Sequence, residues 1–488
     1  MRRYAVPGIA HLTLRSVTAA VAVVALATLP TLPASAHDDK VRMPEVRSVE
    51  GIDVPIATSD NVKLVDSVPR PGAISGVFSP SAPYFYVSTL ESIDVYDVRD
   101  RLHPVLTGTL PQAIFENEAM NYGERTNAMG KTTRFVLVGV DLTQASGSDI
   151  EHSNPTGKNE VVVVDVTNPA APFIRSRTLA TSSTHTVACV DVRNCGTAYT
   201  AGSKVGEVGK YSIIDLSNLD QPKEVDADSS TAGVQGFHSP ASGPGGPLTA
   251  GHKWNFDNAG YGFHTGGAGT AVFDVSRPRA PQLVSTTGAA GVAPGWNDFI
   301  HHNSERPNAQ AFQPFRSPSV SNGNVLLITE EDYENTDCAT AGSFQTWKIT
   351  TLNGTPSAVK PLDRINPVTE GGGGISPPVN AFCSAHWFDY HPSGIVALAT
   401  YAGGLRLIDV RDPKNITQYG YATLGASEVW DAYWAPKRNR SGVAIGRSNI
   451  VYTVDLVRGL DVYSVALPST GTALPYLGRS SQYSILSG

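Results

Sequence analysis

A short hydrophobic pattern recurs along this chain, with apolar side chains at most positions and an aspartate close to its end. It reads SIDVYDV at residues 92–98 and EVVVVDV at 160–166, and further copies lie at 210–216, 269–275, 343–349, 404–410 and 459–465. Segments this short and rich in Val and Ile predict β-strands rather than helices. Five of the seven copies have aspartate at the sixth position, where we expect hydrogen bonds within turns and between repeats: Asp97, Asp165, Asp215, Asp274 and Asp409.

Each copy follows a hairpin pattern, seen best at residues 385–400, where two strand-like runs flank the turn sequence HPSG. Each repeat therefore predicts four antiparallel strands, and seven such sheets arranged radially form a β-propeller. We expect an all-β fold, a seven-bladed β-propeller of four-stranded antiparallel blades that spans residues 61–488 as one domain. The strand-like segment 62–68 precedes the first full repeat, and we expect it to complete the last blade and close the ring.

The pattern (L/V)-x-(I/V)-(I/V/F)-D-V, followed in several copies by a proline-containing turn, resembles the repeat of the LVIVD family of secreted bacterial β-propellers. The match covers nearly all of residues 60–480, and the family resemblance implies the fold but no catalytic residue, because the motif is a core strand. Propellers with histidine-lined mouths include nitrous oxide reductase and the selenium-binding, methanethiol-oxidase family, which use copper there. The full ligand set of neither is recognisable here, so the resemblance assigns no residue a role.

The composition agrees with many short strands joined by turns. The chain has 488 residues, of which 46 are glycine and 34 are proline, and this share of turn residues makes an all-helical fold improbable. With 41% hydrophobic and 17% charged residues, the chain belongs to the globular class rather than the disordered one. The formal net charge is −7 and no Lys/Arg-rich run follows the N-terminal segment, which excludes a nucleic-acid partner.

The N-terminal segment predicts export. Three arginines precede an apolar run at 17–29, and the run leads to the sequence ASA at 34–36, which signal peptidase recognises. We therefore predict a signal peptide at 1–36, an N-terminal extension at 37–60 and a secreted, extracellular mature protein. The apolar run has 13 residues, too few for a helix that spans a bilayer, and no later run is long enough, so we expect no transmembrane segment.

Four cysteines are consistent with an oxidising compartment, where an even number favours two disulfides. Three pairings are compatible with four cysteines, and we favour Cys189 with Cys195 and Cys338 with Cys383. The first pair flanks the turn of one hairpin, so its bond is local. The second would tie an acidic loop at 330–337 to the start of the next blade and so hold the rim of the propeller in place.

Histidines gather at the places where blades begin. In a propeller the first strand of each blade lines the central channel, and the entries of these strands open on one shared face. Of the 11 histidines that remain after signal cleavage, five occupy the entries of blades three to six: His185, His252, His301, His302 and His386. We predict His185, His252, His302 and His386 as metal ligands, and we place Glu118 and Asp431 at the entries of blades two and seven.

The loops after the second strands supply further candidates for the same face, among them Asp141, His264, Glu331 and Asp455. The turn at 257–260 predicts a hairpin in which His252 and His264 lie almost opposite each other, so His264 is a fifth candidate ligand. Neutral imidazole and carboxylate are the ligands of zinc, copper, manganese and iron. A transition metal of this kind is the one cofactor that the sequence suggests.

Two functions remain open at this stage. The first is a monomeric binding or interaction module whose mouth, rich in histidine and carboxylate, takes a small-molecule, glycan or protein ligand. The alternative is a metal-dependent oxidoreductase or hydrolase with Glu118, Glu331 or Asp431 as general base. A channel histidine can also simply donate to a backbone carbonyl, so a structural polar network is the competing interpretation of the histidines. The glycine run 371–374 leads into no helix pattern and predicts a flexible connection.

Overall fold

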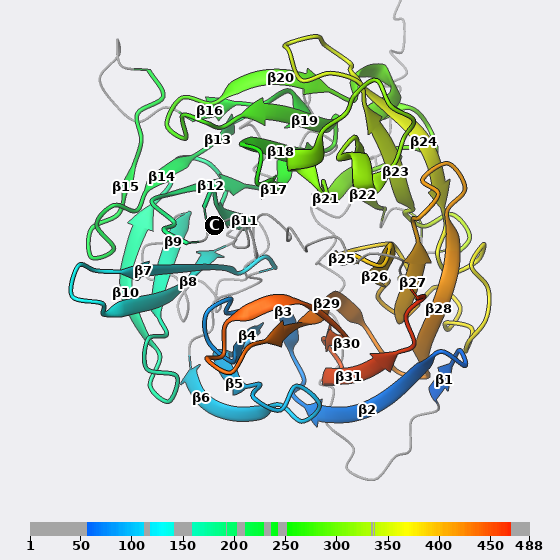
Figure 1. Cartoon of the computed structure of the whole chain (residues 1–488), viewed down its shortest axis with the longest axis horizontal. Coiled ribbons are helices and arrows are strands. Elements are labelled where there is room, and N and C mark those ends of the chain that lie inside the picture. Colours follow the sequence, from blue (N-terminus) through cyan, green and yellow to red (C-terminus); the bar gives the residue numbers. More distant parts are fainter. Residues whose placement is uncertain are drawn as a thin grey trace, which may run out of the picture.

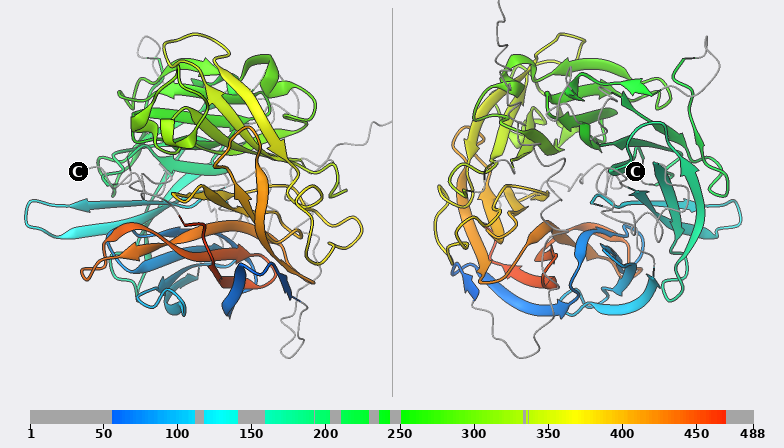
Figure 2. Two further views of the ribbon diagram at one scale, coloured as in Figure 1. Left: turned by 45° about the vertical axis from the view of Figure 1, so that its right-hand side comes forward. Right: turned by 180° about the vertical axis from the view of Figure 1, so that it is seen from behind.

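Seven antiparallel sheets stand around one centre in the computed structural model, and the chain passes through them in order (Figure 1). The structure describes residues 56–111, 118–140, 159–191, 193–202, 210–228, 236–242, 251–332, 335 and 337–469. The predicted signal peptide lies outside these residues. Seen from behind, the same ring of sheets surrounds the centre (Figure 2). The predicted seven-bladed β-propeller is confirmed.

The first four blades each contain four strands in sequence order from the centre outward. Blade one is β3 (Ala73–Phe78), β4 (Tyr84–Thr89), β5 (Ser92–Asp97) and β6 (Val105–Pro111), and blade two is β7 (Asn121–Thr126), β8 (Thr132–Val140), β9 (Glu160–Asp165) and β10 (Phe173–Leu179). Blade three is β11 (Thr186–Cys189), β12 (Thr197–Ala201), β14 (Ile213–Asp215) and β15 (Lys223–Glu224), with β13 (Lys210–Tyr211) paired to β16 (Phe237–His238) beside it. Blade four is β17 (Gly251–Phe256), β18 (Tyr261–Gly266), β19 (Gly269–Asp274) and β20 (Gln282–Thr286).

The last three blades complete the ring. Blade five is β21 (Ile300–Glu305), β22 (Val325–Glu331), β23 (Phe344–Ile349) and β24 (Val359–Ile365). Blade six is β25 (Phe388–His391), β26 (Ile395–Ala399), β27 (Leu405–Asp409) and β28 (Thr417–Leu424), with β1 (Ile56–Thr58) as a fifth strand. Blade seven is β29 (Val429–Arg438), β30 (Ala444–Asp455), β31 (Gly459–Val465) and β2 (Val62–Pro69). Short 3-10 turns lie at Pro240–Ser242, Gly288–Val292, Ala309–Ala311 and Val320–Asn322.

The ring closes between the two ends of the described chain. Strand β2 pairs antiparallel with β31, from Val62 opposite Val465 to Pro69 opposite Gly459, and it lies beside the C-terminal strands in Figure 1. The sequence predicted this closure. It did not predict β1, which lies in the segment expected as an extension and pairs with β28 of blade six.

The recurring sequence pattern forms the third strand of every blade, and in five blades an aspartate ends that strand. In five blades one carboxylate oxygen of this aspartate accepts a hydrogen bond from the backbone N–H two residues later, at 2.8 to 3.0 Å. Such a bond stabilises the turn that leads to the fourth strand. Asp215 also bonds Arg279 of the next blade, so the expected contact between repeats occurs there as well.

The core consists of the faces between neighbouring blades. Phe85 of blade one packs edge-on against Tyr433 and Tyr452 of blade seven, with ring centroids 5.6 and 5.5 Å apart. Apolar side chains from blades one, two, three and seven form one continuous buried cluster. Burial of these faces fixes each blade against its neighbours, and therefore fixes the entries of the inner strands relative to one another.

Both predicted disulfides are present. Cys189–Cys195 lies within blade three, and Cys338–Cys383 joins two segments 45 residues apart, the loop after β22 and the entry of blade six. Disulfides of this kind are typical of proteins that fold in an oxidising compartment. In the part of the chain that the structure describes, no helix is long and apolar enough to cross a membrane.

Candidate metal centre at the channel mouth

Five successive blades bring a glutamate and four histidines together at the starts of their inner strands. Glu118 precedes β7, His185 precedes β11, His252 lies in β17, His302 lies in β21 and His386 precedes β25. All five side chains are buried. Ligand atoms of Glu118, His185 and His252 lie within 4.8 Å of one another, and so do those of Glu118, His302 and His386. We call these five residues the axial cluster.

The Glu118 carboxylate lies at the centre of the axial cluster. Its Oε2 is 2.5 Å from Nε2 of His185 and 3.4 Å from Nε2 of His252, while its Oε1 is 2.5 Å from Nε2 of His386 and 3.3 Å from Nε2 of His302. Each carboxylate oxygen thus faces one pair of imidazoles. The Nε2 atoms of His185 and His252 are 3.1 Å apart. Two nitrogens bound to one zinc ion at about 2.0–2.1 Å, at angles of about 90–110°, are separated by about 2.8–3.4 Å.

Two β-bulges aim histidines at Glu118. The pairing of β17 with β18 shifts between Gly251 and Lys253, and the pairing of β21 with β22 shifts between His301 and Asn303. The extra residues at these shifts are His252 and His302. A bulge re-aims a side chain out of the regular alternation of a strand, which explains how both rings reach the same centre.

Backbone carbonyls determine which ring nitrogens face Glu118. Nδ1 of His252 donates to the carbonyl of His302 at 3.2 Å, and Nδ1 of His386 donates to the carbonyl of Trp430 at 2.5 Å. In a neutral ring this leaves Nε2 as a lone pair that points at the carboxylate. A lone pair and a carboxylate oxygen repel each other at 2.5 Å, so the arrangement requires a proton or a metal cation between them.

Burial keeps at least two of these rings neutral. The pKa of His252 is lowered mainly by burial, with the charge of His185 adding to the effect and Glu118 opposing it. The pKa of His302 is lowered further, again mainly by burial, with His252 and His386 nearby. Neutral imidazoles are the form that binds metals.

A second carboxylate borders the axial cluster. Glu331, at the end of β22, lies 3.5 Å from His302 Nε2 and 3.7 Å from His386 Nε2, and the Tyr401 hydroxyl donates to it. Burial and the Glu331 charge raise the pKa of Tyr401 well above its ordinary value, so this phenol stays protonated. The backbone of Tyr401 has a φ of 49°, in the left-handed region that non-glycine residues seldom adopt. Tyr401 was not among the residues predicted from the sequence. It nevertheless follows the second strand of blade six, just as the other loop candidates follow the second strands of their own blades.

His264 does not join the axial cluster, contrary to the expected pair with His252. The register that runs from the turn at 257–260 puts His264 opposite Trp254 instead, and its ring stacks on that indole with centroids 4.5 Å apart. Its Nδ1 bonds the Ser239 hydroxyl at 2.6 Å. Burial lowers the pKa of His264 to about 3. His264 is therefore a neutral core residue of blade four.

His301 also faces away from the axial cluster. Its two ring nitrogens bond the hydroxyl of Thr270 and the carbonyl of Trp296, each at 2.9 Å, and burial lowers its pKa to about 4. Of the two adjacent histidines in β21, one therefore has a structural role and the other belongs to the cluster.

Asp431, the third candidate base, lies outside the groups of ligand atoms that converge in the described residues. Its carboxylate accepts hydrogen bonds from the Tyr433 hydroxyl and from the backbone N–H of Ala432. Asp141 lies outside the described residues. Asp455 caps the turn after β30, where it accepts from the backbone N–H groups of Glu428, Val457 and Arg458 and from the Ser427 hydroxyl.

Asp455 should make stability depend on pH. Burial, with the Asp461 charge, raises its pKa to about 6 from an ordinary value of 3.8. The folded state thus holds this proton more tightly than the unfolded state does. The protonated Asp455 therefore contributes up to about 3 kcal/mol to the free energy of unfolding below pH 4, and this contribution is lost as the pH rises through 6. Asp455→Asn keeps an oxygen for the backbone N–H groups and removes the charge. We expect the free energy of unfolding of the variant, relative to the parent, to increase between pH 4 and pH 7 in denaturant titrations; a constant difference would contradict the raised pKa.

Comparisons with known proteins extend to the fold alone. A solved structure with a similar fold is the β-propeller domain of Cps50 (Swd1) from Myceliophteria thermophila, 9% identical, with 83% of this chain and 100% of that chain covered and a TM-score of 0.48. No family model matches this chain and no curated protein matches it. Membership of the LVIVD-repeat family therefore stays a prediction.

Proposed function

We propose that this protein is a secreted binding module that holds a transition metal at the channel mouth, with the axial cluster as the ligand set. The observation that carries the proposal is that one carboxylate lies among the Nε2 atoms of four histidines, contributed by four successive blades. A metal cation satisfies all of these acceptors at once. Imidazole and carboxylate together favour zinc, copper, iron or manganese over calcium.

The stoichiometry follows from how the ligands are grouped. Each oxygen of Glu118 and its pair of histidines form a set of two nitrogens and one oxygen. One ion could be shared by all four rings, or two ions could be bridged by Glu118. A metal held by a single set of three protein ligands would have a position left for a ligand with a lone pair, and this is how the metal would serve the binding function.

An enzymatic function is the second candidate, and Glu331 favours it. Its carboxylate lies beside His302 and His386 without being central to the cluster, and Tyr401 orients it. A carboxylate in this place could accept the proton of a metal-bound water in an oxidoreductase or a hydrolase. Glu331→Gln should then abolish turnover while the metal content stays within about twofold of the parent; equal loss of both would make Glu331 a ligand instead.

The metal content of the purified protein tests the proposal. After expression in an exporting host and dialysis against metal-free buffer, we expect one or two equivalents of one transition metal per chain. His386→Ala should lower this content at least about tenfold, because it removes a ligand. His264→Ala is the matched control, since His264 is equally buried but bonds Ser239 outside the cluster, and it should keep its metal. Less than about a tenth of an equivalent in the parent, which His386→Ala leaves unchanged, would show that protons and not a metal satisfy the cluster.

A further inference from the structure

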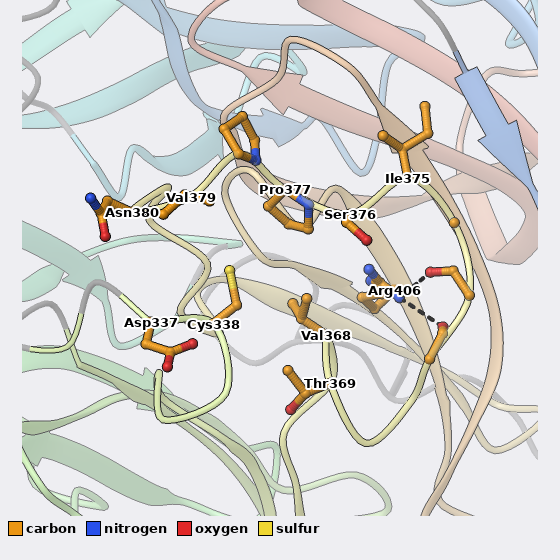
Figure 3. Close-up of a pocket in the computed structure, with 14 residues that line it drawn as sticks. Asp337, Cys338, Val368, Thr369, Ile375, Ser376, Pro377, Val379, Asn380 and Arg406 are labelled. Atoms are coloured by element: carbon orange, nitrogen blue, oxygen red, sulfur yellow. Dashed lines mark hydrogen bonds between the residues drawn. The ribbon is translucent and has the colours of Figure 1, made fainter.

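A second site lies on blade six, beneath the long connection between β24 and β25. A cavity of about 590 Å³ is lined there by Val368, Ile375, Pro377 and Pro378, by the Cys338 side of the disulfide, and by Arg406 of β27 (Figure 3). This volume lies within the range of about 300–1,000 Å³ that is typical of small-molecule sites. The cavity is separate from the axial cluster, since none of the cluster residues lines it.

The glycine run forms one wall of this cavity. Gly372, Gly373 and Gly374 have φ angles of 68°, 74° and 87°, a conformation that side chains disfavour. A Cβ atom at Gly374 would lie 2.4 Å from Oγ1 of Thr423. The run predicted as a flexible connection is thus a shaped wall, and glycine is needed to bring the backbone close to blade six.

Arg406 supplies the charge of the site. Its side chain is buried, with 1% of the residue exposed. Nη1 donates to the carbonyl of Gly372 at 3.1 Å (Figure 3). It also donates to Oε1 of Gln418 at 3.1 Å, and Nε donates to the carbonyl of Gly403 at 3.0 Å. The other terminal nitrogen, Nη2, makes no hydrogen bond within the described part of the chain, and it remains for a ligand of the cavity that Arg406 lines.

Two other buried arginines each have a carboxylate partner, which Arg406 lacks. Arg306 bonds the carboxylate of Asp257 at 2.8 Å, and Arg447 bonds that of Asp389 at 2.6 Å. Among the described residues, no carboxylate lies within ion-pair distance of Arg406; its hydrogen-bond acceptors are all neutral oxygens, and its guanidinium lies 5.8 Å from the ring centroid of Tyr421. Burial accordingly lowers the pKa of Arg406 to about 10. A buried charge without a counterion is costly, so an anion in the cavity would bind favourably.

We propose that this cavity binds a small organic carboxylate, with its carboxylate on Nη2 of Arg406 and an apolar body against Val368, Ile375 and Pro377. Asp337 lies at the opposite end of the lining from Arg406 (Figure 3). Its carboxylate disfavours a second negative charge there, so the site selects a monoanion rather than a dianion such as phosphate. The proposal does not depend on metal at the axial cluster.

The probe is 4-bromobenzoate, with neutral 4-bromobenzamide as its uncharged analogue. In calorimetric titrations of the purified protein we expect 4-bromobenzoate to bind with a Kd of about 1 mM or tighter and the amide at least about tenfold more weakly. Arg406→Gln should weaken 4-bromobenzoate at least about tenfold. Arg411→Gln, which removes an exposed arginine of the same blade, should bind like the parent.

Two further measurements distinguish binding in this cavity from effects of misfolding and from binding at the axial cluster. Ser376→Trp fills the cavity from its exposed rim without touching the bonds of Arg406, and it too should abolish binding. The bromine position in an anomalous difference map should lie in the cavity, both in the parent and in His386→Ala. Bromine at the channel mouth alone, absence of binding at 10 mM, or equal affinity in Arg406→Gln and the parent would each overturn the proposal.

Discussion

Replacing Glu118 by glutamine is expected to weaken metal binding at least about 100-fold. Loss of a residue that only hydrogen-bonds a metal ligand typically lowers metal affinity about 10–100-fold, and Glu118 contacts all four rings directly, so its loss should lower the affinity more. Glutamine has nearly the same shape, yet it removes the negative charge and turns one oxygen into an N–H donor. That donor could serve one histidine pair, while the other pair would keep an oxygen. The affinity is measured by competition with a chromophoric chelator.

Thermal unfolding gives a second measurement of the same loss. A metal at 1,000 times its Kd stabilises the folded state by about 4 kcal/mol, so a chelator should lower the Tm of the parent by several degrees. At the same metal concentration, a 100-fold weaker site stabilises the fold by only about 1.4 kcal/mol, so a chelator should lower the Tm of Glu118→Gln by no more than about a third as much. Glu330→Gln is the matched control, since Glu330 is also buried but bonds Asp298 and Ser343 outside the axial cluster. If Glu118→Gln and Glu330→Gln hold metal equally well, Glu118 is no ligand.

The fold was predictable from the sequence because one strand is repeated. A strand pattern that recurs seven times, five times with aspartate at its sixth position, determines the strand, its turn and the number of blades together. The entries of the inner strands could then be located by their place in the repeat, which is why the sequence predicts that Glu118 and the four histidines lie near one another. The closure of the ring by β2 was predictable because the strand-like segment 62–68 lies outside the seven repeats.

The finer geometry depends on contacts that no local pattern encodes. The hairpin register puts His264 opposite Trp254, and the bulge then turns His252 out of the pairing altogether, so the predicted histidine pair was wrong. Tyr401 and Arg406 were missed because each lies in or beside an ordinary strand. Tyr401 matters because its hydroxyl bonds Glu331, 70 residues away in the sequence. Arg406 matters because a loop that folds back over blade six accepts a hydrogen bond from it. Such contacts are set by packing between blades rather than by the residues next in sequence.

Removal of β2 is expected to have the largest effect on stability. A chain that begins at Arg70 would lack the fourth strand of blade seven, which pairs with β31 along its whole length, and its Ser67 hydroxyl contact with Asp461. The ring would then be open, with β31 as an unpaired edge and its buried side chains, such as Leu460 and Val462, exposed. We expect a loss of more than about 5 kcal/mol in the free energy of unfolding, beyond the range of most single substitutions.

Matched truncations distinguish the effect of opening the ring from the effect of shortening the chain. A chain that begins at Ile56 keeps both β1 and β2 and should unfold like the longer protein, and one that begins at Ser59 loses only the three-residue β1 and should lose little. A synthetic peptide of residues 56–69, added to the chain that begins at Arg70, should restore cooperative unfolding, because an added strand can complete an open sheet. Since the axial cluster draws on five blades held by this ring, metal should bind again in the same titration. Unfolding of the Arg70 chain at the temperature of the Ile56 chain would show that the ring is held by its other six interfaces.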